Sequence, residues 1–580
     1  MSPKTCWFYP RGLSRFLLPV LLLAGLGPQA RAVPAQPAKA EATIRPMVLG
    51  RLKFATSTTG VEAHQAFVSG VLLLHLFEYR LALGELHRAQ QLDPSFALAY
   101  WGEAMAFNHA IWGQQDTAAA RAVLARFGPD RATRLARISD ERERGFFAAV
   151  EDLYGDGTKG ERDRAHARAM ESLARRYPDD DEVQLFYALA LFGAHAGVRD
   201  VPDYMRAAAI AQHVFTKNPQ HPGAAHYLIH GVDDATHAPL GIDAARALSR
   251  IAPDSPHALH MTSHIFLMLG LWDDVVAANE ASTAAANNWC EIRGIPQRHY
   301  GHGNFWLEYA YLQQGRPAAA RALLLVARKE SLDPSLPPPP VKEYDPDNSV
   351  QGSLVQMWSR YLLETGDWQD EIADWQFPLG DALDPNLTYA WTQGFRRAQL
   401  RQSEQATQWL EKFTATRARL ATAISQAAEA KEADQLYLRR VETLELILRS
   451  AIAQSRGRTG EAGTLAQQAL VIESGLPDAF GPPFVDLPSR EWLAQLLLQS
   501  GEHAAAEKLF GAQLGTTPLR SSSLLGLATA AFRAGHAEVA ARTLAQLRTN
   551  WHEAEPIVRK KQDAVAAELA AVNASAATKR

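Results

Sequence analysis

Cysteine is scarce in this chain: its 580 residues include only two, Cys6 and Cys290. Two cysteines can form neither a disulfide framework nor a four-cysteine zinc site. An excess of one charge is also lacking, because 59 Lys and Arg stand against 63 Asp and Glu, a formal net charge of −4. Without a basic block to neutralise phosphates, the composition argues against nucleic acid as a partner.

Long apolar runs are lacking too, except near the N-terminus. A basic stretch, residues 4–15, precedes an apolar run, residues 16–26, that is too short to span a bilayer comfortably. A small-x-small pattern that ends at Ala32 fits a cleavage site. We therefore expect a cleavable Sec-type signal peptide, a periplasmic or secreted protein, and no stable membrane insertion after cleavage. An uncleaved membrane anchor is the alternative.

Landmark residues recur at intervals of 34 along the rest of the chain. Pro219 and Pro253 are 34 residues apart, and so are Gly501 and Gly535. Between such landmarks lie apolar residues at helical spacing, and no stretch shows sustained alternation with a period of two. The pattern predicts an all-α fold, a right-handed helix-turn-helix solenoid of degenerate 34-residue repeats. Each helical pair would bury its apolar face by stacking on its neighbours.

Composition and repeats together divide the chain into segments. A run of four prolines, residues 337–340, indicates a stiff linker between two arrays of repeats. The predicted segments are a signal peptide (1–32), a flexible lead-in (33–45), an N-terminal solenoid (46–330), a Pro-rich linker (331–347), a C-terminal solenoid (348–560) and a tail (561–580).

Histidine is concentrated in one part of the N-terminal solenoid. Ten of the 19 histidines fall within residues 213–302, where even spacing would place about three. HYLIH puts His226 and His230 four residues apart, HALHMTSH does the same for His260 and His264, and the two pairs are 34 residues apart. Residues four apart share a helix face, and equivalent helices of adjacent repeats lie side by side. We therefore expect the four imidazoles to point into one small region.

Such a cluster suits a metal ion, because neutral imidazole is the commonest metal ligand and this spacing holds zinc in HExxH proteases. Tyr227 and Met261 follow the first histidines, so the catalytic Glu of those proteases is absent. Two aspartates continue the helical face of the first pair, and histidine with carboxylate could hold Zn, Cu, Fe or Mn. The predicted metal ligands are His226, His230, Asp233, Asp234, His260 and His264.

A helical pair of 34 residues resembles the tetratricopeptide repeat. In residues 63–94, small residues and proline occupy the positions that this repeat favours, namely Gly70, Ala82, Ala89 and Pro94. Most of residues 60–545 is similar to a group of bacterial exported tetratricopeptide-repeat proteins. Besides these positions, the similarity rests on the motifs HYLIHGVDDATHAPLG and IAPDSPHALHMTSHIFLMLGLWDD. The resemblance implies fold and export, and it supplies no reaction.

The resemblance also implies a concave groove lined by the first helix of each repeat. It places the histidine pairs on that lining and brings further side chains near them. Possible additional ligands are His257, His302, His299 and His109, although for His299 the pattern favours a loop residue over a ligand. Trp101 and Asn108 are expected at the groove wall.

Three functions remain open. The first is a scaffold that binds a protein or peptide in its groove and carries a metal site there. The second is a metal-dependent enzyme, hydrolytic or redox, in which an open coordination position activates water. The third is a metal-free interaction scaffold whose histidines form a structural polar layer, and metal-free acid–base catalysis is a lesser variant. Histidine nitrogens gathered around one point would favour the metal, and nitrogens turned to separate carbonyls would favour the structural layer.

Overall fold

The structure is a computed structural model, and it describes residues 47–195, 198–292, 301–334, 350–426, 432–477, 480–483 and 485–578. The predicted signal peptide and lead-in, His299 and most of the predicted linker lie outside these residues. Within them the regular structure is almost wholly helical. The one strand pair described is antiparallel, β1 (Asn108–His109) with β2 (Gln114–Gln115), and sets Asn108 opposite Gln115. The all-α prediction is confirmed.

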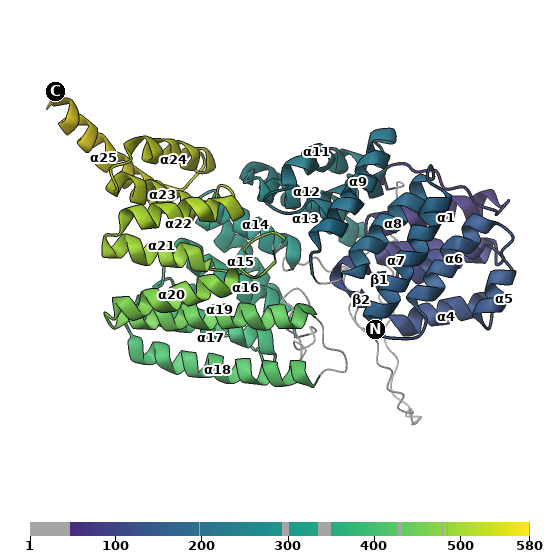
Figure 1. Cartoon of the computed structure of the whole chain (residues 1–580), viewed down its shortest axis with the longest axis horizontal. Helices are drawn as coiled ribbons and strands as arrows, with labels where there is room; N and C mark the ends of the chain where they lie inside the picture. Colours follow the sequence, from purple (N-terminus) through teal and green to yellow (C-terminus); the bar gives the residue numbers. More distant parts are fainter. Residues whose placement is uncertain are drawn as a thin grey trace, which may run out of the picture.

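Two lobes lie side by side, with the early helices in one and the later helices in the other (Figure 1). The helices of the N-terminal lobe are α1 (Val61–His75), α2 (Tyr79–Leu92), α3 (Ala97–Met105), α4 (Thr117–Phe127), α5 (Arg131–Ala136), α6 (Glu141–Leu153), α7 (Lys159–Arg176), α8 (Asp181–Ala194), α9 (Val201–Lys217), α10 (Pro222–Gly231), α11 (Ile242–Ile251), α12 (Pro256–Met268) and α13 (Trp272–Ile292).

The remaining helices continue the array into the second lobe. They are α14 (His302–Gln313), α15 (Pro317–Ser331), α16 (Val350–Thr365), α17 (Leu383–Gln399), α18 (Ser403–Ser425), α19 (Glu432–Ser455), α20 (Thr459–Glu473), α21 (Ser489–Ser500), α22 (His503–Thr516), α23 (Ser521–Arg533), α24 (Ala537–Asn550) and α25 (Pro556–Thr578). Short 3₁₀ turns lie at 110–112, 238–241 and 371–374. Helices α14 and α15 precede the predicted linker, yet both pack against α16 beyond it.

Consecutive helices pack against each other along the chain, which makes the molecule a solenoid of helical hairpins. The repeat length is visible in the helix starts: α10 and α12 begin 34 residues apart, at Pro222 and Pro256. Both helices have proline in the first turn, where its missing N–H costs nothing. A side-chain cap precedes each proline, since His221 accepts from the Ala224 N–H and Ser255 from the Ala258 N–H.

Small residues set the spacing of the first helices. A Cβ on Gly70 would lie 2.6 Å from Leu86 Cγ, and a Cβ on Gly102 would lie 2.7 Å from Leu86 Cδ2. The fully buried Leu86 of α2 therefore fits between α1 and α3 only because both positions are glycine.

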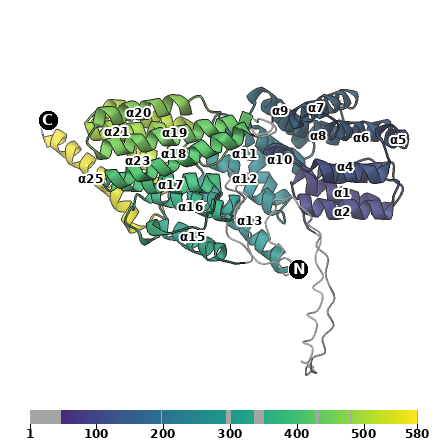
Figure 2. The same cartoon turned by 90° about the horizontal axis from the view of Figure 1, so that it is seen from below.

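The end of the array contacts its middle. Ser521, at the start of α23, donates from its N–H to Gln313 Oε1 at 2.9 Å, and the Trp551 indole donates to the Gln313 carbonyl at 3.1 Å. Figure 2 shows α10, α11 and α12 near the centre of the molecule and α25 at the far end of the second lobe. Among the described residues, none of the helices combines the length and the apolar character needed to cross a bilayer.

Candidate metal centre

Two successive helices carry the predicted histidine pairs. His226 and His230 lie one turn apart on α10, and His260 and His264 occupy the equivalent positions on α12. All four are buried, with at most 5% of each residue exposed. The 34-residue offset read from the sequence therefore corresponds to two packed helices, because α10 contacts α12 directly.

The histidines form two groups of three rather than one group of four. The first triad is His226, His230 and His257, and the second triad is His260, His264 and His302. Within each triad, one ligand nitrogen per ring lies within 4.8 Å of the others. The third member of each triad comes from the first turn of the next helix of this series: His257 lies in α12 and His302 begins α14. The triads are adjacent, with ring centroids of His230 and His264 6.1 Å apart.

Oxygen acceptors hold the Nδ1 atoms of three of these rings. His226 Nδ1 donates to the His75 carbonyl at 2.6 Å, His260 Nδ1 to Asn279 Oδ1 at 2.7 Å, and His264 Nδ1 to Asp233 Oδ2 at 2.6 Å. The Asn279 amide nitrogen is engaged with the Val275 carbonyl, so its oxygen is the atom that faces His260. Because these oxygens only accept, each Nδ1 carries the proton and each Nε2 carries a lone pair.

The Nε2 atoms of each helical pair face each other. His260 Nε2 lies 3.2 Å from His264 Nε2, and His226 Nε2 lies 3.1 Å from His230 Nε2. In the second triad both atoms present lone pairs, so neither can donate to the other. Two nitrogens bound to one tetrahedral zinc ion, at Zn–N distances of about 2.0–2.1 Å, would lie about 3.3 Å apart.

Burial keeps four of the imidazoles neutral. It lowers the pKa of His226 to about 3, and it is also the main cause that lowers the pKa values of His230, His257 and His260 well below the usual 6.5. Neighbouring imidazoles lower them further, because two positive charges at this distance repel. The neutral ring is the form that binds a metal ion.

One aromatic ring contacts all three histidines of each triad: Phe77 in the first and Trp306 in the second. Phe77, in the turn between α1 and α2, has a positive φ of 56° and places its ring 4.4 Å from that of His226. Trp306 of α14 lies 4.2 Å from His264. Gly481 permits the approach of a loop to this indole, since any Cβ there would overlap the Trp306 ring. No sequence pattern predicts the position of Phe77, because it depends on a strained turn far from the histidines in the chain.

The two predicted aspartates have different partners. The expectation that both continue the helix face is wrong, because α10 ends at Gly231. Asp233 is fully buried and holds His264, and its other oxygen, Oδ1, has no hydrogen-bond partner among the described residues. Asp234 instead accepts from Arg199 at 2.6 Å and from His237 Nδ1 at 2.8 Å. The structure thus places Asp233, but not Asp234, in contact with a triad.

The predicted wall residue Trp101 and the possible ligand His109 both lie away from the triads. Trp101 is buried in the core among Phe54, Phe146 and Phe186. His109 stacks on Tyr79, with ring centroids 4.1 Å apart.

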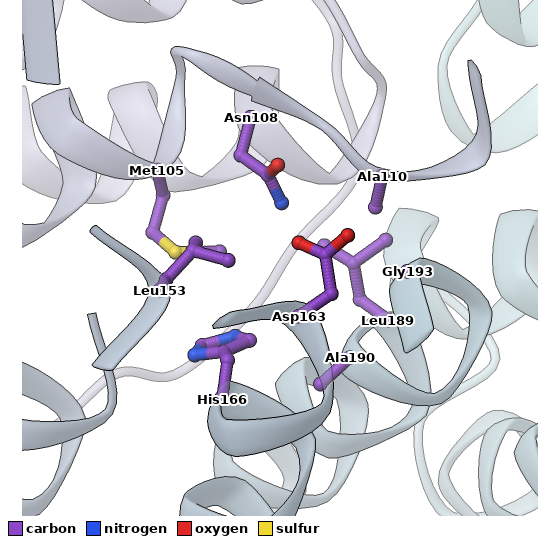
Figure 3. Close-up of a pocket in the computed structure, with 9 residues that line it drawn as sticks. All are labelled: Met105, Asn108, Ala110, Leu153, Asp163, His166, Leu189, Ala190 and Gly193. Carbon is purple, nitrogen blue, oxygen red and sulfur yellow. The ribbon is translucent and has the colours of Figure 1, made fainter. Parts of the chain in front are cut away.

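Asn108 lines a separate cavity of about 10 Å³, together with Asp163 and His166 (Figure 3). That volume is enough for about one water molecule. Lys159 pairs with Asp163 at 2.5 Å, and His166 Nδ1 donates to the Ala149 carbonyl at 2.9 Å. This cavity is not part of the histidine cluster.

A second buried histidine group has all its partners within the protein. Glu182 accepts from His75 Nε2 at 2.9 Å and from His221 Nε2 at 3.0 Å. The remaining ring nitrogens accept, from the Tyr227 hydroxyl at 2.9 Å and from the Ala224 N–H at 3.3 Å. Burial opposes the Glu182 charge, yet the two histidines hold the pKa of this carboxyl at about 2. This group supports His75, whose carbonyl in turn holds His226.

Glu78 fixes the start of α12 beside the first triad, which the sequence did not predict. Its buried carboxylate accepts from Ser255 Oγ at 2.8 Å and from the His257 N–H at 3.3 Å. Burial raises the pKa of this carboxyl to about 7.

Together these contacts define a class of protein: a helical-repeat solenoid with a buried polyhistidine centre. No family model and no curated protein matches the chain. Among solved structures, it is similar to the APC/C hetero-tetramer Cut9–Hcn1, with 10% identity over 88% of this chain and 77% of that chain and a TM-score of 0.31. It is also similar to the TPR domain of P58(IPK), with 11% identity over 88% of this chain and 99% of that chain and a TM-score of 0.20. No functional inference rests on either.

Proposed function

We propose that this protein is an exported helical-repeat scaffold that binds a divalent transition metal at its clustered histidines. The observation that carries the proposal is the pair of Nε2 atoms of His260 and His264, 3.2 Å apart. Both present lone pairs, because both Nδ1 atoms donate to oxygen. A cation between them removes the repulsion, and a buried polar pair without a partner costs roughly 1–3 kcal/mol.

The donor set narrows the choice among Zn, Cu, Fe and Mn. The triads offer imidazole nitrogens only, and imidazole suits Zn, Cu and Fe, whereas Mn prefers carboxylate and water. Asp233 would act through His264, whose orientation and basicity it sets. Copper and zinc are the ions that this arrangement favours most, copper by the general affinity order.

Metal content is the first measurement. The protein, purified without a histidine tag, is titrated with Zn²⁺ and Cu²⁺, desalted and measured by plasma mass spectrometry. We expect at least one equivalent in the wild type and a clear loss in His264→Ala with unchanged helicity by circular dichroism. The exposed His213→Ala is the matched control. A wild type that retains neither metal would leave the histidines as a structural layer.

Export is supported by the basic and apolar pattern of residues 1–32. The test is the N-terminal sequence of the protein recovered from a bacterial periplasmic fraction. A mature chain that begins at Val33 is expected, and an intact Met1 in a membrane fraction would indicate an anchor.

Partner binding is supported by a groove between the lobes with a volume of about 210 Å³. Met268, one turn beyond His264, lines it from the first lobe, and Leu476 and Thr516 line it from the second. We propose that a protein or peptide segment binds there. A photo-crosslinker at Thr516 should label such a partner, and Met268→Arg should abolish the labelling without loss of metal.

A metal-dependent hydrolase is the second candidate, favoured by the number of ligands. Three histidines per triad leave one position of a tetrahedral ion for water, as in catalytic zinc sites. Hydrolysis of nitrophenyl esters by the zinc-loaded protein, absent from the apoprotein and from His264→Ala, would support it. Equal rates in all three would exclude it for that substrate class.

A further inference from the structure

We infer that the centre is dinuclear, with one ion in each triad and a small anion between them. This inference rests on the proposed metal binding. Ligands of one ion lie about 2 Å from it, so their nitrogens are separated by no more than about 4 Å. The two helical pairs meet this limit internally, at 3.1 and 3.2 Å. The ligand nitrogens of the six rings fall into two sets of three, each within 4.8 Å, and these two sets are the triads.

The repeat itself generates two equivalent sites. Each has a histidine pair at the same positions of one helix and a third histidine from the first turn of the next helix in the series. Helix α12 serves both, because His257 faces the first triad while His260 and His264 belong to the second. The third rings close each set: the centroid of His257 lies 5.1 Å from that of His226, and the centroid of His302 lies 4.8 Å from that of His260.

Charge indicates the class of ligand between the ions. Two divalent ions bring four positive charges to six neutral imidazoles. Of the two nearby aspartates, Asp234 is already paired with Arg199. Asp233 contributes one negative charge through His264, and its Oδ1 has no hydrogen-bond partner among the described residues. A small anion such as hydroxide would offset part of the excess, since uncompensated charge is costly in a buried site.

The phenyl ring of Phe77 and the indole of Trp306 flank opposite ends of the cluster. Phe77 contacts only first-triad rings among the six histidines, with centroids 4.4 to 5.6 Å away. Trp306 contacts only second-triad rings, with centroids 4.2 to 5.3 Å away. The space common to both ions is thus bounded by apolar rings at each end, which favours a small ligand over a large one.

Copper stoichiometry tests the inference. The probe is Cu²⁺ added in excess to the full chain, with bound copper counted by plasma mass spectrometry after desalting. We expect two equivalents in the wild type and in His213→Ala. His257→Ala should retain one equivalent, in the second triad, and His302→Ala should retain one, in the first. The double variant should retain less than one.

Electron paramagnetic resonance gives a second readout that does not depend on affinity. Two neighbouring Cu²⁺ ions couple, so the fully loaded wild type should show a broadened or weakened signal. Each single variant should show the sharp signal of one isolated ion. Where an alanine variant unfolds, glutamine at the same position replaces it, with circular dichroism as the criterion.

One equivalent in the wild type, or loss of all copper in both single variants, would overturn the dinuclear arrangement and leave metal binding intact. Retention of two equivalents in either single variant would also overturn it. No copper or zinc in the wild type would instead refute the proposed function itself.

Discussion

The charged network around Arg520 in the second lobe and the histidine cluster in the first lobe are both buried, but they differ in what completes them. In the C-terminal lobe, Arg520 is almost fully buried and pairs with Glu364 at 2.5 Å and with Glu491 at 2.8 Å. Arg360 pairs with Asp486 at 2.5 Å, also in the interior. The N-terminal lobe also buries an ion pair, Arg199 with Asp234, but in addition it buries histidines whose Nε2 atoms face one another.

The difference distinguishes buried polar groups that complete one another within the fold from buried polar groups that are suited to bind a ligand. Around Arg520 the opposite charges complete each other, so that network needs nothing from outside the chain. Elsewhere in the same lobe, both oxygens of the buried Glu308 have no hydrogen-bond partner among the described residues. The facing lone pairs of His260 and His264 have no such complement among the described residues, and the proposed cation would supply it. The group around Glu182 shows that this lobe can also satisfy histidines internally, since both rings there donate to one carboxylate. A buried histidine therefore indicates a ligand site only when its hydrogen bonds within the protein leave a ring nitrogen without a partner.

The largest effect is expected from Arg520→Met in the charged network. Removal of the guanidinium leaves Glu364 and Glu491 buried without a counter-ion, which costs about 3–5 kcal/mol of stability. Urea unfolding followed by circular dichroism measures the loss, and metal content per folded chain should not change. A loss of stability below about 1 kcal/mol would contradict the stabilising role of the Arg520 network. A parallel loss of metal would contradict its independence from the histidine cluster.

Asp233→Asn should weaken metal binding by about 10- to 100-fold, the usual effect of losing a carboxylate that orients a ligand histidine. Competition with a chelator of known affinity measures the change. Asp234→Asn is the matched control, because its carboxylate serves Arg199 and His237 instead. Equal weakening in both variants would mean that local charge, rather than the contact with His264, sets the affinity.

Acid should destabilise the N-terminal lobe through its buried neutral histidines. Burial lowers the pKa of His109 to about 4. In the unfolded chain the pKa of a histidine is about 6.5, so between pH 4 and pH 6.5 the unfolded chain binds more protons than the folded chain. The contribution of His109 to the free energy of unfolding is complete above pH 6.5. It falls as the pH drops towards 4, by at most about 1.4 kcal/mol per pH unit.

His109→Gln should therefore reduce the dependence of apoprotein stability on pH over that range. Urea unfolding at half-unit pH steps measures it. His87→Gln, on an exposed face of α2, is the control for loss of an imidazole. An unchanged slope in His109→Gln would show that the stacked ring on Tyr79 does not titrate with unfolding.

The smallest effect is expected at a surface ion pair of the second lobe. Arg542 and Glu538 lie one turn apart on α24 at 3.9 Å, and both side chains are largely exposed. Arg542→Ala should change stability by less than about 0.5 kcal/mol in the same urea assay. A larger loss would mean that the cost of Arg520→Met is not specific to buried pairs.

The sequence predicted the repeats and the register of the histidine pairs, because both depend on spacing along a helix. It did not predict the two triads. His257 and His302 lie in the first turns of helices, and the interval before His302 includes the 21-residue α13, so no 34-residue offset marks it. Helical spacing predicts the same role for Asp233 and Asp234, but it does not apply beyond Gly231, where α10 ends. Phe77 and Glu78 were missed because their contacts join residues roughly 150–180 positions apart.

The contact of α23 and α24 with Gln313 has a consequence for how this protein can evolve. An open solenoid can gain or lose a repeat at small cost, because each unit touches only its neighbours. Here Glu555 donates its N–H to the Gly315 carbonyl and accepts from the Ala318 N–H at 2.7 Å, some 240 residues away in the chain. A repeat inserted between α16 and α22 would displace these partners from each other. The number of repeats in the second lobe is therefore fixed by closure. The contacts of His75 with His226 and of Glu78 with Ser255 constrain the first lobe in the same way.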